Sequence, residues 1–299
     1  MKIAVVADSN SGITQEEGKR LGIYVLPMPF IIDGETYEED VTLTQEQFYE
    51  KQASGADIST SQPSPESVMD LWNRLLEQEG YDQIVHIPMS SGLSGSCQTA
   101  RMLAEDYDGR VQVVDNQRIS VTQRQSAIDA RDLAASGFDA AQIREILERM
   151  ALESSIYVMV DTLKYLKKGG RITPAAAALG TLLKIKPVLQ IQGEKLDTFS
   201  KARTVKQAKN IMLAAAVHDL EERYHDPEAE HTWLAVVQAC NPEAAGEFAA
   251  EIRERFPKTD EIYLDSISLS ISTHTGPNIL AVGCTKKLDI EAEKERYGI

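Results

Sequence analysis

Small hydroxylated residues and glycines gather in the segment 90–96, which reads Ser-Ser-Gly-Leu-Ser-Gly-Ser. The segment follows the apolar run 84–87, which is typical of a buried strand, and precedes apolar residues at helical spacing from Cys97 to Tyr107. Where a strand leads into a helix, free N–H groups and hydroxyl donors lie at the positive helix end and can bind a carboxylate or phosphate. We therefore expect an anion site here, with plain helix capping as the alternative.

The same segment nearly matches the GxSxG turn of hydrolases, with Ser94 in the place of the nucleophile. Ser96 stands where that motif has its last glycine, and a hydrolase also needs a histidine and an acid near the serine. His274 can be that histidine only if the fold brings it close. A serine hydrolase acting on lipid esters through Ser94 and His274 is therefore kept as the alternative hypothesis.

Two further hydroxyl-rich segments could contact a ligand. The segment 60–64, Thr-Ser-Gln-Pro-Ser, leads into a helix that Ser64 is expected to cap, and capping does not explain Thr60. The segment 273–277 places His274 between two threonines, in what we interpret as a tight loop before the last strand. Both loops are candidates for binding a polar head group.

A basic cluster is formed by Lys164, Lys167, Lys168 and Arg171, and two glycines precede the arginine. A glycine pair costs backbone entropy unless a positive φ or a close approach requires it, so we expect Arg171 to be held in a constrained turn. The alternative is a charged helix C-terminus that stops at glycine. On an acidic chain, this cluster is expected to meet a small anion or an acidic protein partner.

Strand-like and helix-like segments alternate along the chain and predict a parallel α/β architecture. With 299 residues, two α/β domains are expected, at 1–155 and 156–299. Ligands in open α/β sheets bind at the carboxyl ends of strands. We therefore expect the polar loops 8–12, 58–64 and 90–96 to converge on one pocket.

Composition excludes several classes of function. The formal net charge of −15 argues against nucleic acid as a partner, because binding it requires clustered cationic side chains. No apolar run approaches the roughly 18 residues of a transmembrane segment, and no signal peptide is recognisable. Cys97, Cys240 and Cys284 have no paired spacing and are expected to be buried thiols of a cytoplasmic protein. Neither a GxxxxGK[ST] nor a GxGxxG loop is present, and no metal-ligand spacing occurs.

Six short segments, in order across nearly the whole chain, resemble the DegV family. They are Asp8-Ser9, Thr60-Ser61-Gln62-Pro63-Ser64, Ser90-Ser91-Gly92-Leu93-Ser94-Gly95, Lys168-Gly169-Gly170-Arg171-Ile172, Lys184-Ile185-Lys186-Pro187 and His274-Thr275-Gly276-Pro277. The resemblance implies a DegV-like fold of two α/β domains that bury one long-chain fatty acid, roughly C16–C18, between them. It further implies no catalysis and no cofactor of the protein's own.

The resemblance also implies a partner and site residues. Similar proteins are the fatty-acid-binding subunit of bacterial fatty acid kinase, in which a separate ATP-binding subunit phosphorylates the carboxylate. The acyl phosphate then enters phospholipid synthesis. By position in these motifs, the expected fatty-acid-binding residues are Thr60, Ser91, Ser94, Gly95, Arg171, His274 and Thr275. Arg171 and Arg203 are expected to contact the kinase subunit or the phosphate.

Two positions depart from the family pattern. Asn278 stands where a second glycine is common, and asparagine tolerates the left-handed region well enough for the turn to survive. Gly12 stands where an acid is frequent.

A further alternative is a kinase subunit that binds a small polyol, because the DegV-like fold is related to dihydroxyacetone kinase subunits.

Overall fold

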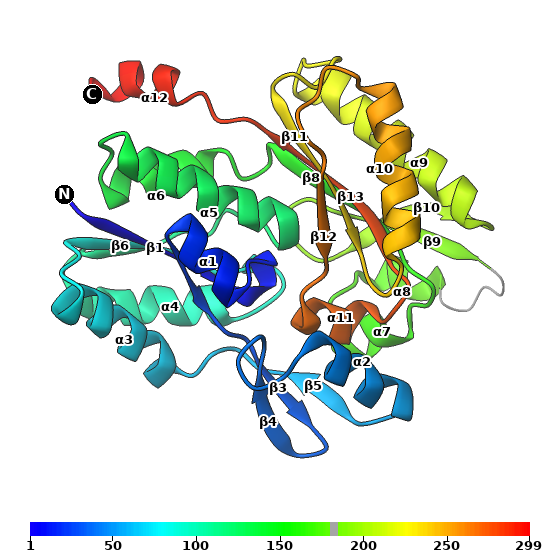
Figure 1. The fold of residues 1–299 in the computed structure, drawn as a ribbon, viewed down its shortest axis with the longest axis horizontal. Helices are drawn as coiled ribbons and strands as arrows, with labels where there is room; N and C mark the ends of the chain where they lie inside the picture. Colours follow the sequence, from blue (N-terminus) through cyan, green and yellow to red (C-terminus); the bar gives the residue numbers. More distant parts are fainter. Residues whose placement is uncertain (180–184) are drawn as a thin grey trace. The chain divides into compact units, whose positions relative to one another are not determined.

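A computed structural model describes residues 1–179 and 185–299, so Lys184 of the fifth family-like segment lies outside the described residues. The described chain divides into two compact units (Figure 1). The first contains Met1–Ala151, Ser268–Ser270 and Leu288–Ile299, and the second contains Leu152–Ile267 and Ile271–Lys287. The sequence analysis did not foresee the two short returns to the first unit. That residues 1–155 and 156–299 form two separate domains stays a prediction.

The first unit alternates strands and helices. Its elements in chain order are β1 Ile3–Asp8, α1 Gln15–Leu21, β2 Ile23–Leu26, β3 Pro29–Ile32, β4 Glu35–Glu38, α2 Gln45–Ser54, β5 Ile58–Thr60, α3 Pro65–Asn73, β6 Gln83–Ile87, α4 Ser96–Ala104, β7 Val111–Val113, α5 Ser120–Ala135, α6 Ala140–Arg149 and α12 Ile290–Tyr297.

The central sheet of this unit is parallel, in the order β2-β1-β6-β7. One face carries Val5, Ala7, Val85 and Ile87 and packs against apolar side chains of α5 and α6. The other face packs against α3 and α4, with Trp72 fully buried. Helices thus cover both faces, as parallel sheets require, and the predicted α/β class is confirmed for this unit.

The helix at 65–73 forms as its local residues predict. The Ser64 hydroxyl accepts the N–H of Ser67 at 3.1 Å, and Pro65 occupies the first helical position, where no N–H is needed. In contrast, the run at 24–32 is divided between β2 of the parallel sheet and β3 of a small antiparallel sheet, β4-β3-β5. Proline at 27 and 29 ends one strand and opens the next.

The second unit has one large sheet. Its elements in chain order are β8 Ser154–Met159, α7 Lys164–Gly169, α8 Pro174–Ala178, β9 Lys186–Ile191, β10 Asp197–Ala202, α9 Val205–His218, β11 Thr232–Gln238, α10 Pro242–Arg255, β12 Tyr263–Ser266 and β13 Leu280–Lys286. The helix α11, Leu269–Thr275, begins in the first unit and continues in the second.

The sheet of the second unit is mainly antiparallel, so the prediction of a parallel architecture throughout was wrong here. Its order is β10-β9-β8-β13-β11-β12, and only β11 and β12 run parallel in the described residues. The cause is the pairing of β8 with β9 and of β13 with both β8 and β11, which alternation of strand and helix signals cannot reveal. Helices α9 and α10 pack on one face of this sheet, around Met212 and Phe248.

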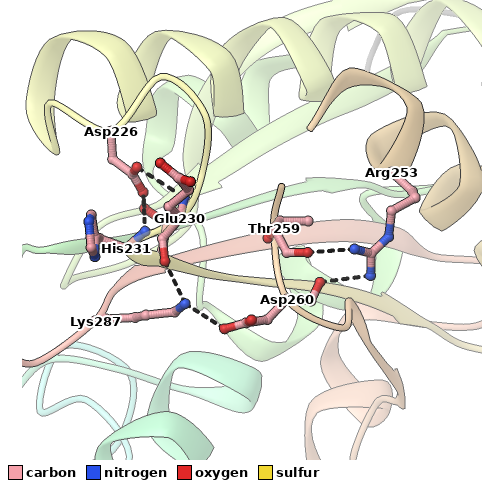
Figure 2. A network of polar contacts seen from close by, with 8 residues as sticks. Asp226, Glu230, His231, Arg253, Thr259, Asp260 and Lys287 are labelled. Carbon is pink, nitrogen blue, oxygen red and sulfur yellow. Dashed lines mark hydrogen bonds and ion pairs between the residues drawn. The ribbon is translucent and has the colours of Figure 1, made fainter. Parts of the chain in front are cut away.

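A polar network fixes the loops at one end of this sheet (Figure 2). The buried Asp226 carboxylate accepts the N–H of Glu230 at 3.0 Å and of His231 at 2.8 Å. The Lys287 ammonium donates to the Glu230 carbonyl at 2.7 Å and to the Asp260 carboxylate at 2.5 Å. The network ends where the chain leaves the second unit, so we assign it a structural role.

The cysteine prediction holds at two of its three positions. Cys97 and Cys284 are buried, whereas Cys240 is exposed, with φ of 59°. It follows β11 directly, in a turn before α10, so its side chain has no core to enter.

Candidate functional site

The turn between β6 and α4 holds Ser94 by backbone and side-chain bonds. The Ser90 carbonyl accepts the N–H of Leu93 at 3.0 Å and of Ser94 at 3.3 Å. The Ser94 hydroxyl in turn accepts the N–H of Ser96, the first residue of α4, at 3.2 Å. The contact does not cap α4, whose N-cap residue is Gly95 without a side-chain cap, so the alternative of plain capping by Ser94 is not seen. The hydroxyl can still donate its own hydrogen to a ligand.

Ser91, Ser94 and Gly95 differ in exposure. Ser94 is half-buried, while Ser91 and Gly95 are exposed. The Ser91 N–H donates to the Asp115 carboxylate at 3.3 Å, which leaves its hydroxyl on the surface. Among the three, Ser94 is therefore the side chain best placed to hold an anion away from bulk water.

The loop that follows Thr60 touches the start of α4. Thr60 is half-buried at the end of β5, paired with Phe30 in the small sheet. The Gln62 amide donates to the Thr99 hydroxyl at 3.1 Å, and a Cβ on Gly95 would lie 3.2 Å from the Gln62 carbonyl oxygen. The glycine is thus explained by a close approach, and the Thr60 and Ser94 loops are brought together as predicted.

The loop after β1 joins the same cluster. The Asp8 carboxylate accepts the N–H of Met89 at 2.8 Å, the N–H of Asn10 at 3.1 Å and the amide of Gln123 at 2.9 Å. Burial nonetheless raises the pKa of Asp8 to about 6, against these hydrogen bonds. The expected convergence of the three polar loops is therefore confirmed within the first unit.

Glu39 is a second buried acid that the sequence analysis missed. It is 7% exposed and accepts hydrogen bonds from the Ser9 hydroxyl, at 2.6 Å, and from the N–H of Leu269. Burial raises the pKa of Glu39 to about 7. In the sequence it stands in the acidic run 38–40, which is typical of a solvated turn, so no local signal reveals it. The bond to Leu269 accounts for the return of residues 268–270 to the first unit.

In the second unit, His274 lies in the last turn of helix α11 and not in a loop, so that part of the prediction was wrong. The segment is rich in serine and threonine, which are weak helix formers, and packing overrides this preference. The helix ends at Gly276, with φ of 78°, and Asn278 adopts φ of 58°. The expected survival of the turn with asparagine is confirmed.

Gly169 lies directly against the His274 ring. A Cβ on Gly169 would clash with Nδ1 of the imidazole and lie 3.1 Å from its Cε1. Gly170, by contrast, caps α7 with φ of 67° and has open space around it. The two glycines therefore have different reasons: close approach for the first and left-handed backbone for the second.

The electrostatics around His274 keep its ring neutral. Burial, together with the positive charge of Arg171, lowers the pKa of His274 to about 4. At neutral pH the imidazole therefore carries one N–H donor, which a carboxylate can accept. Thr275 is less available, because it is buried and its hydroxyl lies 3.3 Å from the Ile271 carbonyl.

The two arginines lie in different surroundings. Arg171 is half-buried and its guanidinium donates to the Gly169 carbonyl, while its own carbonyl accepts the N–H of Leu196 at 3.1 Å. It is thus held in a constrained turn, as expected. Arg203 is exposed, before the start of α9, and its N–H donates to the Gln207 side chain at 2.9 Å.

Two further properties of the described residues concern other classes of function. No helix there is long and apolar enough to cross a membrane. Across residues 1–179 and 185–299, no cluster of three or more His, Cys, Asp or Glu side chains could hold a metal ion.

Comparison with known proteins places these features in a family. Residues 2–287 match the family described as "Uncharacterised protein, DegV family". A DegV domain-containing protein of Listeria innocua is 33% identical over 283 residues, covering 94% of this chain and 97% of the relative.

Solved structures agree. A DegV family protein from Thermus thermophilus, described for its fatty acid binding, has a TM-score of 0.86 at 30% identity and covers 96% of this chain and 100% of that chain. A stearic acid-binding protein from Eubacterium ventriosum has a TM-score of 0.85 at 26% identity, covering 97% and 99%. The chain therefore belongs to the DegV family.

Proposed function

We propose that this protein binds one long-chain fatty acid and presents its carboxylate to a separate ATP-binding kinase subunit, which forms the acyl phosphate. The single observation that carries the proposal is the Ser94 turn at the start of α4, with the Thr60 loop in contact with it. Hydroxyl donors at a helix N-terminus favour a carboxylate. The fatty acids bound by the related proteins from Thermus thermophilus and Eubacterium ventriosum support this choice of ligand.

We assign the acyl chain to an apolar face of the sheet in the second unit. One face of its sheet packs against α9 and α10, and the alternate residues of the same strands lie on the opposite face. These alternate residues are apolar, buried and in register across β9, β8, β13 and β11: Ile156, Val158, Leu189, Ile191, Ala235, Val237 and Ala281. Burying about 14 methylenes at ~0.8 kcal/mol each gives an upper limit of roughly 11 kcal/mol.

Thr60 and Ser94 are the first candidates for ligands of the head group, and His274 is a further candidate. Ser91, Gly95, Thr275 and Arg171 are secondary candidates for the same group. The neutral imidazole offers an N–H without adding a second positive charge beside Arg171. The tail then dominates the affinity, while the polar groups orient the carboxylate.

Arg171 and Arg203 are assigned to the kinase subunit or to the phosphate. A guanidinium can bind a phosphate through two parallel hydrogen bonds, and the constrained turn limits the entropy that Arg171 loses. Charge reversal to glutamate at either position should leave lipid content normal and depress acyl phosphate formation. If Arg171→Glu purifies without lipid, Arg171 is a head-group ligand.

The direct test is mass spectrometry of the purified, denatured protein, which should release a fatty acid of roughly C16–C18 length. Ser94→Ala and Thr60→Ala should each lose a hydrogen bond to a charged group, worth about 1.5–3 kcal/mol, and slow acyl phosphate formation with the kinase subunit. The matched control is Ser54→Ala, an exposed serine at the end of α2. Normal rates in both site variants would refute the head-group assignment.

The two alternatives predict other results. A serine hydrolase would cleave lipid esters and lose that activity in Ser94→Ala, yet the Ser94 hydroxyl accepts the backbone N–H of Ser96, a contact that does not activate a nucleophile. A polyol-binding subunit would release a small hydroxylated molecule and no fatty acid.

A further inference from the structure

A small chamber lies within the first unit, beneath the turn that carries Ser94. Its volume is about 10 Å³. The side chains around it come from the ends of β1 and β6 and from helices α3 and α4, with their flanking loops: Asp8, Leu26, Pro63, Val68, His86, Pro88, Ser96, Thr99 and Ala100.

His86 borders this chamber from inside the sheet. The residue is 2% exposed, and its ring stacks edge-to-face with Trp72 at 5.6 Å between centroids. Neither ring nitrogen has a hydrogen-bond partner among the described residues. Burial lowers the pKa of His86 to about 3, so the ring is neutral and carries one N–H donor and one acceptor lone pair.

Ser96, at the start of helix α4, also lines the chamber. Its hydroxyl is buried at the first position of α4 and likewise has no partner in the part of the chain that the structure describes. Two residues that line this small volume, His86 and Ser96, thus each carry a buried polar atom without a partner among the described residues. A buried polar atom without a hydrogen bond is unfavourable, so this chamber favours an occupant that can form hydrogen bonds to these atoms.

The size and chemistry of the chamber narrow the class of occupant. An anion is disfavoured by the carboxyl group of Asp8, which also lines the chamber. A metal ion would need a set of donors that the search of the described residues does not find. A volume of about 10 Å³ matches one water-sized sphere, and a buried water is stable where two to four polar partners surround it.

We propose that this chamber is a binding site for one ordered water molecule, which joins His86 of β6 to Ser96 of α4. The water accepts from the protonated ring nitrogen of His86 and donates to the Ser96 hydroxyl oxygen, so it supplies a partner to one polar atom on each side of the chamber. Because the N–H of Ser96 donates to the Ser94 hydroxyl, a water bound to Ser96 would also stabilise the turn that carries Ser94. The site itself does not depend on the proposed function; only this last consequence does.

High-resolution crystal structures of the wild type and of His86→Phe test the site. The wild type should show a density peak within hydrogen-bond distance of a His86 ring nitrogen and of the Ser96 hydroxyl oxygen. In His86→Phe the peak should be lost while the ring still packs on Trp72. A wild-type map without the peak, or one in which a protein group occupies the chamber, overturns the proposal.

Solution NMR gives a second test that needs only the wild-type protein and so does not depend on whether His86→Phe folds. The imidazole N–H of His86 should show a cross-peak to a long-lived water, whereas the exposed His231 serves as the control and should show none. A protected His86 N–H without this cross-peak refutes the site. Neither measurement involves lipid, so the proposed function can fail while the water site stands.

Discussion

Replacing Gly169 by alanine isolates the part that His274 plays in ligand binding. The added Cβ would overlap Nδ1 of the imidazole and lie 3.1 Å from Cε1 and 3.3 Å from Cγ. The ring must therefore retreat by roughly 1 Å, and overpacking of this kind costs about 1–3 kcal/mol of stability. A shift of that size breaks a hydrogen bond between the ring and a carboxylate, whose limit is near 3.2 Å.

The matched control is Gly170→Ala, one residue away. Nothing lies within 4 Å of a Cβ there, but φ of 67° strains alanine by about 1–2 kcal/mol. Both variants should thus lose similar stability in chemical denaturation, whereas only one moves His274. The pair separates a positional effect on the head group from general destabilisation.

The assay is fatty acid binding by delipidated protein, with the pKa of His274 followed by NMR. Loss of one hydrogen bond to a charged group, about 1.5–3 kcal/mol, predicts binding weakened about tenfold to a hundredfold in Gly169→Ala. Gly170→Ala should bind as the wild type does. The reasoning fails if Gly169→Ala binds normally, or if both variants weaken equally.

Three further outcomes follow from the structure. Glu39 titrates from 4.5 in the unfolded chain to about 7 when folded, so the folded state holds the extra proton between these values. Glu39 should therefore contribute a fall of about 3 kcal/mol in the free energy of unfolding as pH rises through that window. Denaturant titrations of Glu39→Gln should show a smaller fall, which leaves the part due to Asp8 and Asp129, whose pKa values burial raises to about 6; the same fall as in the wild type would contradict the assignment. Gly246 lies on the exposed face of α10, and nothing lies within 4 Å of a Cβ there, so Gly246→Ala should raise the unfolding free energy by up to about 1 kcal/mol; a decrease would contradict this reasoning. Asp226→Ala should cost about 2–4 kcal/mol, because the N–H groups of Glu230 and His231 lose their acceptor (Figure 2), while lipid content measured by mass spectrometry stays normal.

Local residue patterns determined several features of this protein. Ser64 and the following proline specify where α3 begins, since a cap and a first-turn proline act over three or four residues. The hydroxyl turn before α4 was identified for the same reason. Asn278 was expected to tolerate a left-handed backbone, and that preference belongs to the residue itself. The six family-like segments also identified the family, because their order along the chain is specific.

Tertiary structure decided what no local pattern carries. The antiparallel pairing in the second unit depends on which strands meet, and strands β8 and β13 are more than a hundred residues apart. The buried Glu39 carboxylate accepts the N–H of Leu269, which lies 230 residues further along the chain, so its environment depends on a distant segment. The reason for Gly169 appears only when helix α11 places an imidazole against its Cα. Capping, turn and helix propensities act between near neighbours, whereas burial and contact depend on packing between residues far apart in sequence.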